Sequence, residues 1–125
     1  MPSDFTAVFL KLRPIMAKHA KELAVKTDTP VEFTLDTRAP SPFPQHKGHP
    51  LQFGSVRVGR SYVSYHLMPI YGSAPLAGGI SPGLKKHMQG KTCFNFKSEP
   101  DPQSIAELAT LTEAALDSWR KLKWL

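Results

Sequence analysis

A short capped helix that runs directly into a strand is the feature that most limits how this chain can fold. Ser81 is typical of a helix N-cap, Pro82 suits the first helical position, and Gly90 can adopt the left-handed conformation that ends a helix. Phe94 and Phe96 then alternate with less apolar side chains, which is the period of a half-buried strand. We therefore predict a helix between Ser81 and Gly90, followed at once by a strand.

An amphipathic helix is predicted at each end of the chain. Apolar residues recur at three- and four-residue steps over residues 3–23, and Pro14 is expected to kink or split this helix because proline removes a backbone donor. The last helix is predicted over residues 102–122, with Asp101 as its N-cap. Its buried stripe is predicted to consist of Ile105, Leu108, Thr112, Ala115, Trp119 and Leu122.

Three further segments are predicted to be strands, separated by turns and one long loop. Residues 31–37 alternate strictly between apolar and polar side chains, and residues 53–58 and 61–68 form a hairpin with a bulge near Gly54 and Ser55. Residues 27–30 are predicted to be a turn. Residues 38–50 contain four prolines and are predicted to be an extended surface loop, since proline cannot donate to a strand ladder.

These elements predict one α+β domain over residues 1–125. It is a two-layer sandwich in which an antiparallel sheet of about four to five strands carries the N- and C-terminal helices on one face. The side chains expected to face the helices are Val31, Phe33, Leu35, Val56, Val58, Phe94 and Phe96. The opposite face is expected to show Glu32, Thr34, Asp36, Ser55, Arg57, Asn95 and Lys97, with either Ser64 and His66 or Val63 and Tyr65.

Composition narrows the possible partners and the cell compartment. The formal net charge is +6, but the lysines and arginines are scattered along the chain, whereas nucleic-acid-binding proteins concentrate such charge on one face. The sequence has no apolar run long enough to span a membrane, no secretory signal, and a single cysteine that cannot form an internal disulfide. We therefore expect a cytoplasmic protein that does not bind membranes. We also expect that nucleic acid is not its main partner.

Two segments, residues 61–69 and 84–97, resemble the YdhG-like superfamily of small bacterial proteins, a domain that is mostly of unknown function. The resemblance covers roughly residues 5–120 and is strongest over residues 56–98. Some relatives are regarded as frataxin-like iron chaperones, which are thought to hold iron with carboxylates on the first helix and the adjoining strand, because iron prefers oxygen ligands there. In this chain the corresponding first helix offers only Asp4 and Glu22 among several cations.

The open face of the predicted sheet is the first candidate binding site. If Glu32, Asp36, Arg57, His66 and Asn95 converge there, they form a polar site for a small ligand or a partner protein. The alternative is an ordinary solvated sheet face. The position of His66 depends on the strand register, because a shift by one residue moves every side chain to the other face.

Other candidate sites are an anion site and a metal site. Ser81 and Gly83 begin the short helix, Lys85 and Lys86 follow, and free backbone N–H groups beside lysines can bind an anion. His46 and His49 are spaced so that both imidazoles could ligate one metal, although zinc sites usually need three or four ligands. The alternatives are an ordinary capped helix and two solvated loop histidines.

The sequence shows no catalytic pattern. Cys93 would need a base or a cationic setting to act as a nucleophile, and no nucleophile elbow or paired histidine and aspartate accompanies it. We therefore expect a non-enzymatic binding or accessory protein for an unknown small ligand or protein. The alternatives are a frataxin-like iron-handling protein and an anion- or nucleic-acid-binding module. An exposed sheet edge also leaves a homodimer open.

Overall fold

A computed structural model of the chain describes residues 3–71 and 73–125. The helices are α1 (Ser3–Ala17), α2 (Ala74–Gly78), α3 (Pro82–Lys85) and α4 (Pro102–Lys121). The strands are β1 (Ala24–Thr29), β2 (Glu32–Pro40), β3 (Pro50–Val58), β4 (Val63–Leu67), β5 (Met88–Gln89) and β6 (Cys93–Phe96). All neighbouring strands pair antiparallel in the order β1-β2-β3-β4-β6-β5.

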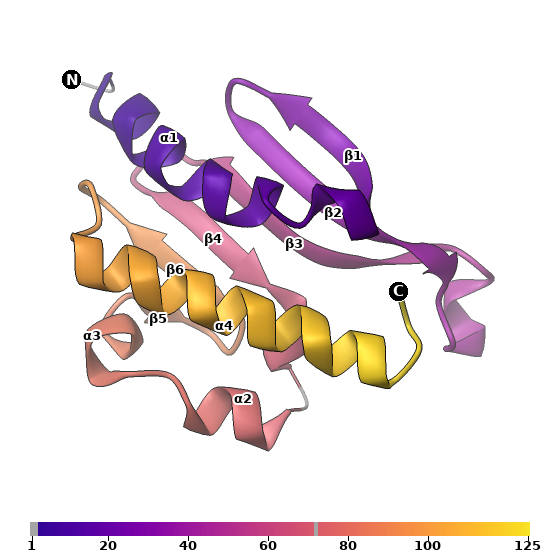
Figure 1. Cartoon of the computed structure of the whole chain (residues 1–125). Coiled ribbons are helices and arrows are strands. Elements are labelled where there is room, and N and C mark those ends of the chain that lie inside the picture. The colour runs from indigo at the N-terminus through magenta and orange to yellow at the C-terminus, as the bar shows by residue number, and fades with distance from the viewer. Residues whose placement is uncertain (1–2, 72) are drawn as a thin grey trace.

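The long helices α1 and α4 lie across the same face of this sheet, as the α+β sandwich predicted from the sequence requires (Figure 1). Within residues 3–71 and 73–125 the sheet has six strands, more than the four to five that the sequence predicts. The short helices α2 and α3 lie beside α4, on the side away from α1 (Figure 1). The α+β class is therefore confirmed, and the structure differs from the prediction in the number of strands and in the bounds of several elements.

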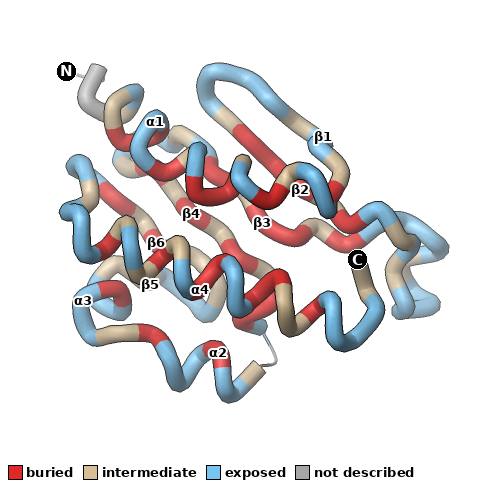
Figure 2. The backbone as a smooth tube through the Cα atoms, in the orientation of Figure 1, coloured by how far each residue is buried: buried red, intermediate tan, exposed pale blue. Residues whose placement is uncertain are grey.

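The core lies between the sheet and the two long helices, where the buried parts of the chain face one another (Figure 2). Tyr65 and Phe94 are fully buried there. The Tyr65 hydroxyl lies 2.5 Å from Thr112 Oγ1, which in turn donates to the Leu108 carbonyl at 2.7 Å. This chain of hydrogen bonds satisfies the polar groups that burial would otherwise leave unpaired, and it joins β4 to α4.

One predicted turn is wrong, because residues 27–30 belong largely to strand β1. This strand pairs with β2 from Ala24 to Thr29, and the turn is confined to Pro30 and Val31. Val31 is therefore 55% exposed and does not face the helices as predicted. The sequence of β1 is mostly polar because it is an edge strand with one neighbour, so it lacks the apolar alternation of an inner strand.

The predicted loop over residues 38–50 is shorter than expected. Strand β2 continues to Pro40 and β3 begins at Pro50, and these two prolines lie opposite each other at the strand ends. Proline is tolerated there because the ladder needs no hydrogen bond from its nitrogen. Residues 41–49 then form the connection, with a short 3₁₀ turn at Pro44–His46.

The predicted helix after Ser81 is also shorter. The Ser81 side chain caps α3 by accepting from the Leu84 N–H at 3.2 Å, as predicted, but α3 ends at Lys85. Met88–Gln89 instead pair with β6 as strand β5. Gly90 has the expected positive φ of 79°, but it serves the turn between β5 and β6.

The long helices differ from the prediction mainly at their ends. Pro14 lies inside α1 without ending it, and the helix stops at Ala17 before a separate 3₁₀ turn. Asp101 caps α4 by accepting from the Ser104 N–H at 2.7 Å, as predicted. Leu122 follows the end of α4 and is 52% exposed, so it is not part of the buried stripe. Leu111 and Leu116 are buried in its place.

Candidate functional site

Cross-strand pairing brings polar side chains together on the sheet face away from the helices. Glu32 lies opposite Arg57, Arg57 opposite Ser64, and Ser64 opposite Asn95, so that the four form one row across β2, β3, β4 and β6. Ser64 Oγ donates to Asn95 Oδ1 at 2.9 Å, and Asn95 Nδ2 donates to Gln89 Oε1 at 2.7 Å. The polar face expected from the sequence is therefore partly organised by its own hydrogen bonds.

The register settles which residues of β4 face outwards. Val63 and Tyr65 are fully buried against the helices, and the residues that alternate with them, Ser64 and His66, lie on the opposite face. His66 pairs with Ser55 on one side and with Cys93 on the other. It thus occupies the row next to the one that holds Arg57 and Asn95.

His66 and Cys93 form a close contact on this face. His66 Nδ1 lies 2.9 Å from Cys93 Sγ and 3.2 Å from Thr92 Oγ1. Burial lowers the pKa of His66 below its ordinary value of 6.5, and burial raises the pKa of the Cys93 thiol, an effect that the Thr92 side chain partly opposes. Both shifts favour a neutral imidazole beside a neutral thiol, whereas an activated cysteine needs the thiolate.

The lowered pKa of His66 predicts a specific pH dependence of stability. In the unfolded chain the imidazole regains its ordinary pKa, so below about pH 6.5 the unfolded state takes up this proton before the folded state does. The stabilisation present at neutral pH is therefore lost as the pH falls through this range, until the folded-state pKa is also passed. In urea unfolding between pH 8 and pH 5, we expect the free energy of unfolding to fall more for the unmodified chain than for His66→Gln. Parallel pH profiles would contradict the prediction, because the other histidines are common to both proteins.

Asp36 lies apart from the other predicted residues of the open face. It pairs with Ala24 and Gln52, beyond an irregularity in the register between β2 and β3. Its Oδ1 atom is buried without a hydrogen-bond partner among the described residues, and burial raises its pKa against the opposing effect of Lys26. The structure therefore brings together Glu32, Arg57, His66 and Asn95 in two adjacent rows but not Asp36.

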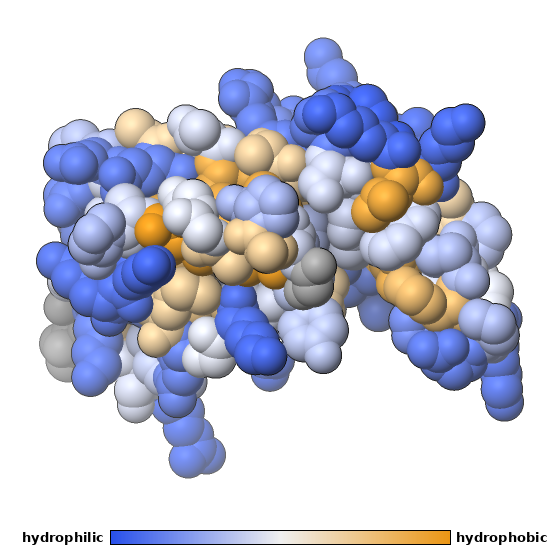
Figure 3. Space-filling view, turned by 90° about the horizontal axis from the view of Figure 1, so that it is seen from below, coloured by the Kyte–Doolittle hydropathy of each residue, from blue (hydrophilic) through white to orange (hydrophobic). Residues whose placement is uncertain are grey.

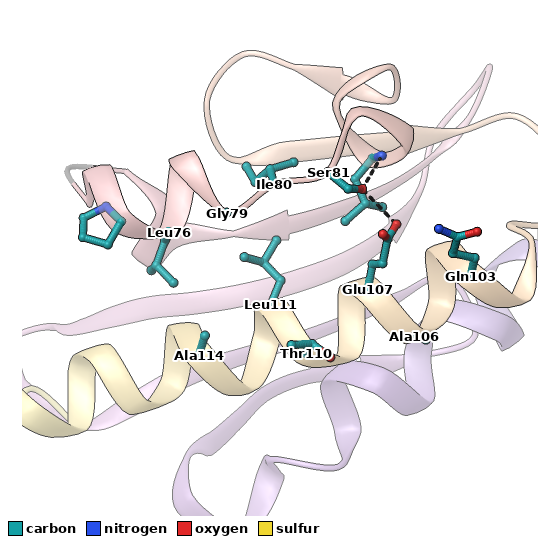
Figure 4. Close-up of a pocket in the computed structure, with 12 residues that line it drawn as sticks. Leu76, Gly79, Ile80, Ser81, Gln103, Ala106, Glu107, Thr110, Leu111 and Ala114 are labelled. Atoms are coloured by element: carbon teal, nitrogen blue, oxygen red, sulfur yellow. Dashed lines mark hydrogen bonds between the residues drawn. The ribbon is translucent and has the colours of Figure 1, made fainter.

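The predicted anion site faces a carboxylate of the protein itself. Ser81 Oγ donates to Glu107 Oε1 at 2.9 Å (Figure 4). Gly83 also lies next to the Glu107 carboxylate. Lys85 and Lys86 are exposed. This end of α3 therefore already has an acidic neighbour, in a pocket of about 420 Å³ between α4 and the α2–α3 segment. On the side of the molecule that carries α2 and α3, apolar residues reach the surface in separate patches (Figure 3).

His46 and His49 lie in the connection between β2 and β3. His46 Nδ1 is 2.7 Å from Ser41 Oγ, and the His49 carbonyl accepts from the Ser41 N–H at 2.9 Å. The described residues contain no group of three or more histidines, cysteines, aspartates or glutamates that could hold a metal ion. Of the two carboxylates on which a frataxin-like iron site would depend, Glu22 is paired with Arg120 at 2.7 Å and the Asp4 side chain lies outside the described residues.

A large aromatic pocket, which sequence reasoning missed, lies beside these two histidines. Its volume is about 1010 Å³, and its apolar lining consists of Phe43, Pro50, Leu51, Met68, Tyr71, Trp119 and Trp124. Phe43 and Trp119 both pack edge-on against Trp124, with ring centroids 5.4 Å and 5.8 Å apart. The β2–β3 connection and the C-terminal end of α4 thus meet at one end of the molecule (Figure 1). We refer to this site as the aromatic pocket.

Most polar side chains that line the aromatic pocket come from one segment, the β2–β3 connection, which forms one wall of the pocket. Gln45, His46, Lys47 and His49 belong to the β2–β3 connection, and Gln52 follows in β3. Predominantly apolar and aromatic walls with a few polar groups are typical of small-molecule sites. The only sequence signal was that the proline-rich loop carries an aromatic residue and two histidines, while both tryptophans lie near the C-terminus.

Comparison of the sequence with protein-family models and curated proteins, and of the structure with solved structures, finds no match. No helix of the described residues is long and apolar enough to cross a membrane. Function therefore has to be argued from the geometry of the two candidate sites, the polar sheet face and the aromatic pocket.

Proposed function

We propose that this protein is a non-enzymatic binding protein that takes a small, largely apolar ligand into the aromatic pocket. The observation that carries the proposal is a pocket of about 1010 Å³ whose walls include four aromatic side chains. Binding sites for drug-sized ligands typically measure about 300–1,000 Å³ and combine apolar walls with a few polar groups. A ligand there would contact the aromatic lining, in which Phe43 and Trp119 both pack against Trp124.

The polar sheet face supports a binding site less well. Several of its side chains are already engaged with one another, since Ser64 bonds to Asn95, Asn95 to Gln89, and His66 to Thr92 and Cys93. A ligand would have to displace these contacts, at a cost similar to what it gained. His66 and Cys93 are both expected to be neutral and are hydrogen-bonded to each other, which gives no support to a catalytic role for this face.

The tryptophans provide a direct test, because the chain has only two and both line the aromatic pocket. We expect 8-anilinonaphthalene-1-sulfonate, an aromatic probe, to quench their emission in a saturable way. Phe43→Ala should weaken this binding roughly tenfold, since an aromatic contact with its buried area contributes about 1–2 kcal/mol. Phe43 is exposed enough that the fold should tolerate the change.

Tyr62→Ala is the matched control, because Tyr62 is a half-buried aromatic residue that lines a different, smaller hollow near Arg57. The control should bind the probe as the unmodified chain does. Absence of quenching, or equal weakening by Phe43→Ala and Tyr62→Ala, would refute the proposal. Circular dichroism of each variant establishes that it is folded.

A further inference from the structure

The charge of the aromatic pocket is one-sided. Among the residues that the structure describes, its lining includes Lys47, His46 and His49 but no aspartate or glutamate. A second cation stands close to its Tyr71 wall, where Lys91 Nζ lies 5.8 Å from the centre of the tyrosine ring. Lys47 and Lys91 are both exposed, so they would attract an anionic group at the surface of the pocket, and added salt would screen this attraction.

The basic and aromatic parts of the lining come from different segments and adjoin at Phe43, whose ring packs edge-on against His46 at 5.5 Å and against Trp124 at 5.4 Å. The basic side chains all belong to the β2–β3 connection, whereas Trp119 and Trp124 come from the C-terminal end of α4 and the residues after it. A ligand that satisfies both parts must therefore have an anionic group at one end and an apolar body at the other.

Hydrogen bonds to Ser41 stabilise the β2–β3 connection and fix the position of its polar residues. Ser41 Oγ accepts from the Phe43 N–H at 3.1 Å and lies 2.7 Å from His46 Nδ1, and the Ser41 N–H donates to the His49 carbonyl. When the Ser41 hydroxyl donates to Nδ1, the ring proton of His46 sits on Nε2, which is then a hydrogen-bond donor. Such a donor suits a carboxylate oxygen.

The aromatic rings favour a flat ligand over a flexible chain. Phe43 and Trp124 meet at 73°, and Trp119 and Trp124 meet at 62°, so their planes lie at steep angles to one another. A planar ring that lies against them can make edge-to-face or offset-stacked contacts, which add about 0.5–1.5 kcal/mol per pair beyond the area buried. A flexible alkyl chain gains no such contacts and loses more conformational freedom on binding.

We infer that the aromatic pocket selects a planar aromatic carboxylate, held by its carboxylate on the Gln45–His49 wall and by its ring against Phe43 and the two tryptophans. This inference rests on the proposed function, because it names the class of ligand for the same pocket. The carboxylate is bound as an intact anion by hydrogen bonds and charge.

The test is a calorimetric titration of the full chain with four probes that differ in one property each. The probes are 2-naphthoate, neutral 2-naphthamide, the cation 2-naphthylmethylammonium, and octanoate, an anion without a ring. We expect 2-naphthoate to bind at least tenfold more tightly than each of the other three. Its affinity should also fall with added salt, since charge contributes to it.

A variant of the polar wall separates charge recognition from simple burial. Lys47→Gln should weaken 2-naphthoate about three- to tenfold and leave 2-naphthamide unchanged. Lys26→Gln removes the same charge from β1, outside the pocket, and should change neither probe.

The outcomes distinguish this inference from the proposed function. If 2-naphthamide or 2-naphthylmethylammonium binds as tightly as 2-naphthoate, or Lys47→Gln weakens all naphthyl probes equally, the anion preference is wrong while the pocket remains a binding site. If octanoate binds as tightly as 2-naphthoate, the preference for a ring is wrong. If none of the four binds below about 1 mM, both the inference and the proposed function fail.

Discussion

Trp119→Ala should lower the free energy of unfolding by about 3–5 kcal/mol, the usual range for truncating a large buried aromatic side chain. Trp119 is 5% exposed and lies on the inner side of α4, where it packs edge-on against Phe53 at 5.8 Å. Urea unfolding followed by far-ultraviolet circular dichroism measures the effect without relying on tryptophan emission. The loss should follow from an unfilled cavity between α4 and β3.

Trp124→Ala is the matched control for this substitution. Trp124 is only half-buried and follows the end of α4, so its removal should cost less than half as much stability. Both substitutions should still weaken binding in the aromatic pocket, since both side chains line it. A loss below about 1 kcal/mol for Trp119→Ala would mean that α4 docks differently from the structure described here.

Phe94→Ala should have an effect of similar size, about 3–5 kcal/mol. Phe94 is fully buried in β6, where it lies opposite Tyr65 on one side and Met88 on the other. Its removal should therefore loosen both the β4–β6 pairing and the short β5 edge. Chemical unfolding measures the loss, and Lys97→Ala, an exposed change just after the same strand, should stay within about 0.5 kcal/mol of the unmodified chain. Equal stabilities of the two variants would place Phe94 outside the core.

The sequence predicts the inner elements well because their burial has a regular period. Phe94 and Phe96 alternate in β6, and both are buried. Phe33 and Leu35 do the same in β2. Strand β1 was not predicted, because most residues of this edge strand are exposed and its apolar residues do not alternate with polar ones. The end of α3 was misplaced because Met88 and Gln89 gain more from pairing with β6 than from another helical turn, and that pairing depends on tertiary contacts.

The candidate sites were harder to predict than the fold for a related reason. To predict the polar sheet face, only the strand register has to be known. Once β4 is paired with β3 and β6, the position of His66 follows. To predict the aromatic pocket, one has to know how segments that are far apart in the chain pack together. Phe43, Tyr71 and Trp124 come from three such segments, and no spacing in the sequence relates them.

The most direct test of the account is a nuclear magnetic resonance titration of ¹⁵N-labelled protein with 2-naphthoate, observed at the two tryptophan indole N–H groups. The account predicts that both indole resonances, from Trp119 and Trp124, shift together and saturate with one dissociation constant. The side-chain amide of Asn95 on the opposite sheet face should stay in place. Indole resonances that do not move, or shifts confined to the polar sheet face, would contradict the assignment of the aromatic pocket as the binding site.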